Sequence, residues 1–167
     1  MGENQSPLKW KGKTSRELKG HAAEQVWPLL ADFCNLHKWL PVLDACYLVD
    51  GVPGQPGVTR YCVAPLPYPD DGTIKWAKEK LLMIDPINHF LSYEITENNF
   101  GFKSYVATMQ LVPINGEDGK TGCIIEWSFV SDPVEGWKYE DLQAVYETYL
   151  ELIAKNMENA LLSSTSR

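Results

Sequence analysis

Glu79 is an acidic residue on the apolar face of a predicted β-strand. Residues 75–85 read KWAKEKLLMID, and alternation along a strand puts every second side chain on the same face. On this pattern Glu79 shares its face with Ala77, Leu81 and Met83, whereas the opposite face carries two lysines and meets water. An ionised carboxylate in an apolar interior is costly unless a cation or a hydrogen-bond donor contacts it. The position therefore indicates either an acid that transfers protons in a cavity or a structural acid held by an arginine.

Arg60 is the candidate partner of Glu79. It lies in a predicted strand at residues 58–64, on the same face as Val58, Cys62 and Ala64, so we expect it to point inward. On neighbouring strands the two side chains could form a bidentate pair. In one interpretation the pair is structural. In the other, Arg60 holds a substrate oxyanion while Glu79 moves a proton.

Three later strands supply aromatic and apolar residues to the same interior. Alternation predicts that the inward side chains are Tyr93, Tyr105 and Trp127, together with Leu91, Ile95, Ala107, Met109, Leu111, Cys123, Ile125 and Phe129. A solid core is one interpretation of this wall. The tyrosine hydroxyls and the carboxylate favour a cavity, because each polar group needs a partner that packed hydrocarbon does not provide.

The elements that position these residues predict an α+β fold. Helical segments are expected at residues 22–33 and 35–41, with Pro28 kinking or breaking the first. Strands are expected at residues 9–19, 45–50, 58–64, 75–84, 90–96, 103–113 and 123–130. A stripe of apolar residues over residues 139–162 predicts one long amphipathic helix. We therefore expect a curved antiparallel sheet of about seven strands around a C-terminal helix, with two short helices after the first strand.

Composition excludes several classes of function. The 167 residues are 44% hydrophobic, which fits a single domain, residues 1–167, with its core at about residues 9–162. A net charge of −7 without a basic cluster argues against nucleic acid as a partner. No apolar run is long enough to span a bilayer and no secretory signal is visible, so we expect a cytoplasmic protein without stable membrane association.

The four cysteines have no zinc-binding spacing. Cys34, Cys46, Cys62 and Cys123 lack CxxC pairs and histidine partners, and a reducing compartment disfavours disulfides. We interpret them as small core residues, with thiol catalysis as a minor alternative. The sequence therefore predicts no metal site.

Several motifs resemble those of the plant lachrymatory factor synthases. In chain order they are LKWKGK, AEQVWPLLADFCNLHKWLP, GVTRY, WAKEKL, SYEITE, YVATMQLV and EWSF. These synthases belong to the Bet v 1 and START-like superfamily of polyketide cyclase/dehydrase and lipid transport proteins, which also contains the abscisic acid receptors. The resemblance runs from about residue 9 to residue 161 and implies a helix-grip fold.

The resemblance implies an isomerase that rearranges an alkenyl sulfenic acid into a thial S-oxide without a cofactor. The arginine and glutamate essential to that family correspond to Arg60 and Glu79, so Arg60 would orient the sulfenyl oxygen while Glu79 relays the proton. The residues expected to contact the ligand are Tyr93, Tyr105, Trp127, Lys75, Leu40, Pro67 and Met109. Lys75 stands where the family pattern has an aromatic residue, and there it would attract an anionic ligand or pair with Glu79.

The receptor branch of the superfamily fits this chain less well. Neither receptor motif, SGLPA or HRL, is present, and Asp44 replaces the lysine that anchors the hormone carboxylate. A typical abscisic acid receptor is therefore not expected. The proline-rich segment at residues 63–69 is nevertheless predicted to form a stiff lid over the cavity mouth.

Two functions remain open at this point, beside a third option, a degenerate domain without activity in which Arg60 and Glu79 are only a stabilising pair. The first is a cofactor-independent isomerase acting on a small sulfenic acid or a related molecule. The second is a non-enzymatic carrier or sensor of an apolar plant metabolite or lipid. Both predict a small hydrophobic or sulfur-containing molecule as the partner.

Overall fold

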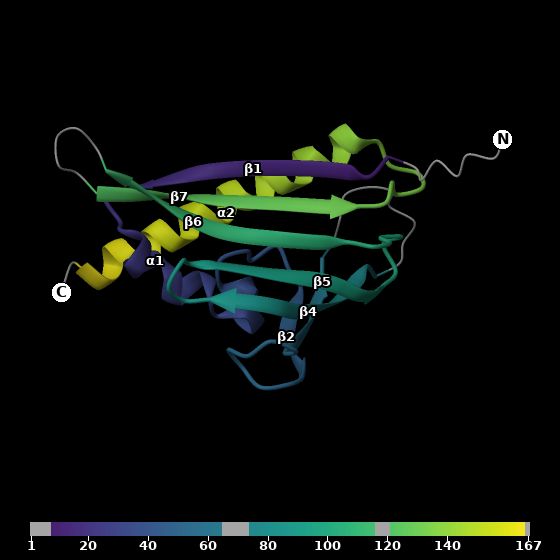
Figure 1. The fold of residues 1–167 in the computed structure, drawn as a ribbon, viewed down its shortest axis with the longest axis horizontal. Coiled ribbons are helices and arrows are strands. Elements are labelled where there is room, and N and C mark those ends of the chain that lie inside the picture. Colours follow the sequence, from purple (N-terminus) through teal and green to yellow (C-terminus); the bar gives the residue numbers. More distant parts are fainter. Residues whose placement is uncertain (1–7, 65–73, 116–120, 166–167) are drawn as a thin grey trace.

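The chain folds into an antiparallel sheet and a long C-terminal helix, with two short helical segments near the N-terminus (Figure 1). The structure is a computed structural model and describes residues 8–64, 74–115 and 121–165. In chain order the elements are β1 (Trp10–Lys19), α1 (Ala23–Leu30), the 3₁₀ helix η1 (Phe33–Lys38), β2 (Ala45–Asp50), β3 (Thr59–Val63), β4 (Trp76–Asp85), β5 (Phe90–Asn98), β6 (Val106–Asn115), β7 (Thr121–Ser131) and α2 (Tyr139–Thr165).

The sheet is curved around α2. Its strand order is β1-β7-β6-β5-β4-β3-β2, and each neighbouring pair is antiparallel. α2 packs mainly against β1, α1 contacts both β6 and α2, and η1 contacts β2 and β3. All three helical segments therefore cover one face of the sheet, which Figure 1 shows from the opposite side. This arrangement confirms the predicted α+β helix-grip fold.

The first helix is shorter than predicted. It begins at Ala23, where the backbone N–H of Ala22 donates to Oε1 of Gln25 at 2.9 Å. It continues through Pro28, ends at Leu30, and is followed by the separate 3₁₀ helix. The predicted break at Pro28 is therefore wrong, because α1 continues through the proline, and η1 is the second helical piece that was expected at residues 35–41.

A β-bulge changes which residues of β4 face the interior. Alternation holds from Ala77 to Leu81, and both are buried. The register with β5 then shifts between Leu81 and Met83. Met83 is consequently 51% exposed, and Ile84, opposite the buried Leu91, packs against the core. The prediction that Met83 points inward is therefore wrong, because one extra residue in a strand reverses the faces that follow it.

The inward positions predicted for the other strands are confirmed. Ten of the eleven predicted side chains are buried and Ile95 is half-buried, and all of them belong to or pack against one hydrophobic cluster. The stripe on α2 also faces this cluster, with Leu142, Tyr146, Ile153 and Met157 buried. Within the described ranges, no helix combines the length and apolar character needed to cross a membrane.

Candidate functional site

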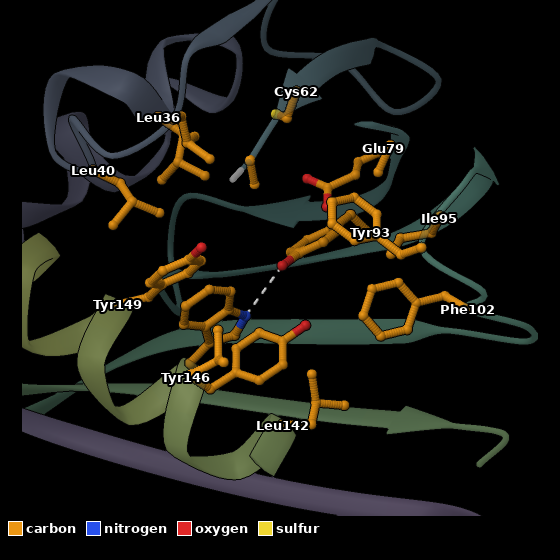
Figure 2. A pocket seen from close by; sticks show the side chains of 16 residues that line it. Leu36, Leu40, Cys62, Glu79, Tyr93, Ile95, Phe102, Leu142, Tyr146 and Tyr149 are labelled. Atoms are coloured by element: carbon orange, nitrogen blue, oxygen red, sulfur yellow. Dashed lines mark hydrogen bonds between the residues drawn. The ribbon is translucent and has the colours of Figure 1, made fainter. Parts of the chain in front are cut away.

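A cavity of about 80 Å³ lies between the concave face of the sheet and α2 (Figure 2). Its walls come from η1 and the turn after it, strands β3, β4, β5 and β7, the loop after β5, and the first turns of α2. The described lining residues are Leu36, Leu40, Leu43, Cys62, Ala64, Ala77, Glu79, Tyr93, Ile95, Phe100, Phe102, Trp127, Leu142, Val145, Tyr146 and Tyr149. Among them, Glu79 is the single charged residue, so the cavity is apolar with one carboxylate in its wall.

Arg60 holds the carboxylate of Glu79 through one of its two oxygens. The residues are direct partners in the β3–β4 register, which places their side chains side by side on the inner face. Nε and Nη2 of Arg60 each lie 2.7 Å from Oε1 of Glu79. The two side chains are 4% and 15% exposed, respectively. The predicted pairing is therefore present, but both bonds converge on Oε1, and Oε2 is the oxygen that the guanidinium does not engage.

Arg60 is enclosed by protein on its remaining sides. Nη1 donates a hydrogen bond to the backbone carbonyl of Phe33 at 2.7 Å. The guanidinium carbon lies 3.9 Å from the ring centroid of Phe33 and 4.9 Å from that of Tyr93, so the cation contacts two aromatic rings. Burial is the largest single effect and lowers the pKa of Arg60. The Glu79 carboxylate, followed by Cys62, Tyr93 and Cys46, raises it, and together these groups hold the pKa above its ordinary value. The guanidinium is therefore a permanent, fixed positive charge beneath Glu79.

Tyrosines and a tryptophan supply further polar groups, in the cavity wall and, for Tyr105, behind it. Nε1 of Trp127 donates to the hydroxyl of Tyr93 at 3.1 Å, the dashed line in Figure 2, and the hydroxyls of Tyr105 and Tyr146 are hydrogen-bonded to each other. Burial is the largest cause that raises the pKa of Tyr93, Tyr105 and Tyr146. The phenols therefore stay neutral near pH 7 and offer hydroxyl dipoles rather than charges.

The loop after β5 carries two of the aromatic lining residues. Oδ1 of Asn98 accepts hydrogen bonds from the backbone N–H groups of Phe100, Gly101 and Phe102 at 2.9 to 3.0 Å. This arrangement folds the loop back on the end of the strand and directs both phenylalanine rings to the cavity. β6 therefore starts at Val106, three residues later than predicted, after Ser104 with a φ of 54°.

The structure brings together some of the predicted site residues and separates others. Glu79, Tyr93, Trp127 and Leu40 line the cavity. Arg60 lies behind Glu79 and, with Met109, borders a separate void of about 10 Å³. Tyr105 is buried behind Tyr146 and is not among the lining residues.

Two of the predicted contacts are not among the described lining residues. Lys75 precedes the first residue of β4, its side chain is half-buried, and it is not a described lining residue. Pro67 and most of the predicted lid fall outside the described residues.

Several lining residues were not predicted from the sequence as site residues. Tyr146, Tyr149 and Leu142 come from α2, and the two phenylalanines come from the loop after β5. The sequence does contain a signal that α2 contributes to the site: two tyrosines lie on its apolar stripe, and their hydroxyls are thereby brought into the interior. Within the part of the chain that the structure describes, no three His, Cys, Asp or Glu side chains gather as metal ligands.

Residues 9–161 match the protein family described as polyketide cyclase / dehydrase and lipid transport. MLP-like protein 31 of Arabidopsis thaliana is 29% identical over 101 residues, which cover 58% of this chain and 54% of that protein. MLP-like protein 34 of the same plant is also 29% identical over 101 residues, which cover 58% of this chain and 29% of that protein. The chain thus spans about half, or less, of the length of the curated relatives it matches.

Solved structures share the fold at low sequence identity. The ginseng major latex-like protein 151 from Panax ginseng has a TM-score of 0.67 at 18% identity, with 90% of this chain and 97% of that one covered. The protein XoxI from Bacillus cereus has a TM-score of 0.66 at 24% identity, with 90% of this chain and 96% of that one covered. At these identities the likeness concerns the fold alone. From the family match over nearly its whole length, the chain belongs to the polyketide cyclase/dehydrase and lipid transport family.

Proposed function

We propose that this protein is a cofactor-independent isomerase that moves a proton within a small, largely apolar molecule. One observation supports the proposal most strongly: a single carboxylate, Glu79, stands in the wall of an apolar cavity with one oxygen held by a buried arginine and the other not engaged by it. A carboxylate in that position has both the orientation and the dry surroundings that general acid–base catalysis requires.

The size of the cavity restricts the substrate. A volume of about 80 Å³ is room for several water molecules, or for a molecule of roughly five to eight non-hydrogen atoms at about 10 to 15 Å³ each. A short alkenyl sulfenic acid is of this size, whereas a sterol or a long acyl chain is far larger. The size therefore favours the small sulfenic acid suggested by the sequence motifs over a lipid.

The reaction needs one group that both accepts and returns a proton. Glu79 would take the proton from the sulfenic S–O–H group and deliver one to the distal alkene carbon, as the double bond moves to give the thial S-oxide. No atom is gained or lost, and the carboxylate is regenerated. In this geometry Arg60 is a positioning residue that acts through Glu79, rather than the direct holder of the sulfenyl oxygen that the motifs imply, because it does not border the described cavity.

The test is a coupled assay with purified protein, an alliinase and an alkenyl cysteine sulfoxide. Wild-type protein should release thial S-oxide, and Glu79→Gln should lower the rate by roughly 100- to 10,000-fold. Glu79→Asp retains the charge but retracts the carboxylate, and we expect an intermediate rate. Glu97→Gln makes the same chemical change on the exposed part of β5, where Glu97 pairs with Lys78 at 3.5 Å, and should leave the rate unchanged.

Two results would reject this function. Absence of product from folded wild-type protein would remove the sulfenic acid activity. Equal rates for wild type and Glu79→Gln would remove the proposed role of the carboxylate. Circular dichroism of each variant establishes that a lost rate is not a lost fold.

A carrier or sensor is the second candidate, and the almost wholly apolar lining favours it. In that case Glu79→Gln should keep the wild-type affinity for small apolar compounds in a thermal-shift screen, since no proton transfer is involved. For either function we propose a cytosolic protein, in which a reducing environment keeps all four cysteines as the free thiols seen here.

A further inference from the structure

Cys46 and Cys62 form a pair of thiols in direct contact. They are directly opposite each other in the β2–β3 register, and their sulfur atoms are 3.3 Å apart, with Cys62 donating to Cys46. Both are free and each is 6% exposed. Two thiols at this distance are close to the position required for a covalent bond.

The backbone geometry also suits a disulfide. Directly opposed residues of antiparallel strands have Cα atoms roughly 4.5 or 5.5 Å apart, and disulfides span Cα separations of about 4.4 to 6.8 Å. The sulfur atoms need to approach from 3.3 Å to a bond length of about 2.05 Å, a shift that side-chain rotation and small strand movements provide. No rearrangement of the sheet is therefore required.

The pair lies between two hollows in the structure. Cys46 borders a groove of about 280 Å³ formed by the residues after α1, strand β2 and the turn that follows it. Cys62 borders the cavity that contains Glu79. A small solute in the groove thus reaches the first thiol, whereas the second forms part of the candidate ligand site.

The surroundings make Cys46 the more acidic thiol. The hydrogen bond from Cys62 is the largest cause that lowers the pKa of Cys46, to about 6, against the opposing effect of burial, and Arg60 and His37 lower it further. The pKa of Cys62 is raised, first by its hydrogen bond to Cys46 and then by burial. The third thiol nearby, Cys34 on η1, has a pKa raised by burial. A thiolate is the reactive form of cysteine, and Cys46 is also the thiol that borders the groove, so Cys46 is the nucleophile and Cys62, on the inner side, is its resolving partner.

We propose that Cys46 and Cys62 are a modification site for small hydroperoxides, which convert the dithiol into a cross-strand disulfide. The Cys46 thiolate attacks one oxygen of hydrogen peroxide, the O–O bond breaks, and Cys46 becomes a sulfenic acid as hydroxide leaves. Cys62 then gives up its proton and attacks the Cys46 sulfur, the S–O bond breaks, and the disulfide forms. In total two thiols lose two electrons and two protons, and peroxide becomes two molecules of water.

The sequence allows a direct test, because trypsin puts each cysteine in a different peptide. Cys46 falls in residues 39–60 and Cys62 in residues 61–75, whereas Cys34 and Cys123 fall in residues 20–38 and 121–138. Reduced full-length protein is treated with hydrogen peroxide near neutral pH, blocked with an alkylating agent, digested without reductant and examined by mass spectrometry. The linked 39–60 and 61–75 peptides should exceed every other cysteine pairing by about ten-fold or more, and a reductant should separate them. In a denaturant this preference should disappear.

Variants identify the role of each thiol. Cys62→Ser should stop at a sulfenic acid on Cys46, which a dimedone-type reagent labels, and Cys46→Ser should leave Cys62 unlabelled. Cys34→Ser is the matched control and should leave the crosslink intact. The proposal is overturned if native wild-type protein forms another pairing in preference, if it forms none while Cys123 or Cys34 is oxidised, or if the labelling of the two variants is reversed.

Discussion

Arg60 and Glu79 form a buried ion pair whose members can be removed separately or together. Arg60→Met keeps much of the side-chain volume but leaves Glu79 facing the cavity without its cation and the carbonyl of Phe33 without its donor. Removing one partner of a buried pair destabilises a protein by about 3 to 5 kcal/mol. Glu79 retains 15% exposure, so we take the lower end and expect a loss of about 3 kcal/mol in the free energy of unfolding.

The loss is large enough to measure by urea denaturation and by thermal melting. For a chain of this size each kcal/mol shifts the melting temperature by about 2 to 4 °C, so Arg60→Met should melt about 6 to 12 °C lower than wild type. The double variant Arg60→Met with Glu79→Leu removes both charges and should be more stable than Arg60→Met alone, since no unpaired charge stays buried. Lys78→Met is the control, because its ion pair with Glu97 is exposed and should contribute less than about 1 kcal/mol.

Two outcomes would refute the reasoning. If Arg60→Met lowers the free energy of unfolding by less than about 1 kcal/mol, the pair behaves as an exposed ion pair and not as a buried one. If the double variant loses as much free energy of unfolding as the two single variants together, the two residues contribute independently and their contact has no interaction energy.

Two further predictions concern the loop after β5 and the dithiol. Asn98→Ala removes the acceptor of three backbone hydrogen bonds and should lower the free energy of unfolding by about 1 to 3 kcal/mol. It should also weaken ligand binding, although Asn98 itself does not contact the ligand, whereas Glu97→Gln next to it should change neither stability nor affinity. Unchanged affinity of Asn98→Ala in calorimetry would contradict this prediction. For Cys46, the pKa of about 6 lies below the value of 9.0 of an unperturbed thiol, so the folded state binds fewer protons than the unfolded state between these values. The stability advantage of wild type over Cys46→Ser should therefore grow as pH rises from about 6 to about 9, as followed by urea titrations at several pH values, and a constant or shrinking difference would contradict the assigned thiolate.

Much of the architecture follows from local patterns in the sequence. Period-two alternation predicts the strands and their inner faces, because successive side chains of a strand point to opposite sides regardless of what they pack against. A period near 3.6 predicts α2 in the same way. Arg60 and Glu79 were identified as inward charges by this reasoning alone, and their pairing followed from the cost of burying a charge without a partner.

Strand register, bulges and cavity shape were decided only by the tertiary structure. The bulge that exposes Met83 and turns Ile84 inward depends on how β4 aligns with β5, and a single sequence contains no signal for one extra residue in a ladder. The small volume of the cavity is the space left after side chains from distant segments have packed, so no single segment determines it.

The sequence by itself thus determined the fold class, the inner faces and the candidate acid with its cation. Tertiary structure decided that Arg60 lies behind Glu79 rather than at the cavity surface, that α2 contributes tyrosines to the wall, and that Cys46 meets Cys62. The physical reason is the range of the interactions: backbone periodicity acts over a few residues and can be seen in a sequence, whereas register and packing join residues that are far apart along the chain and depend on the whole fold.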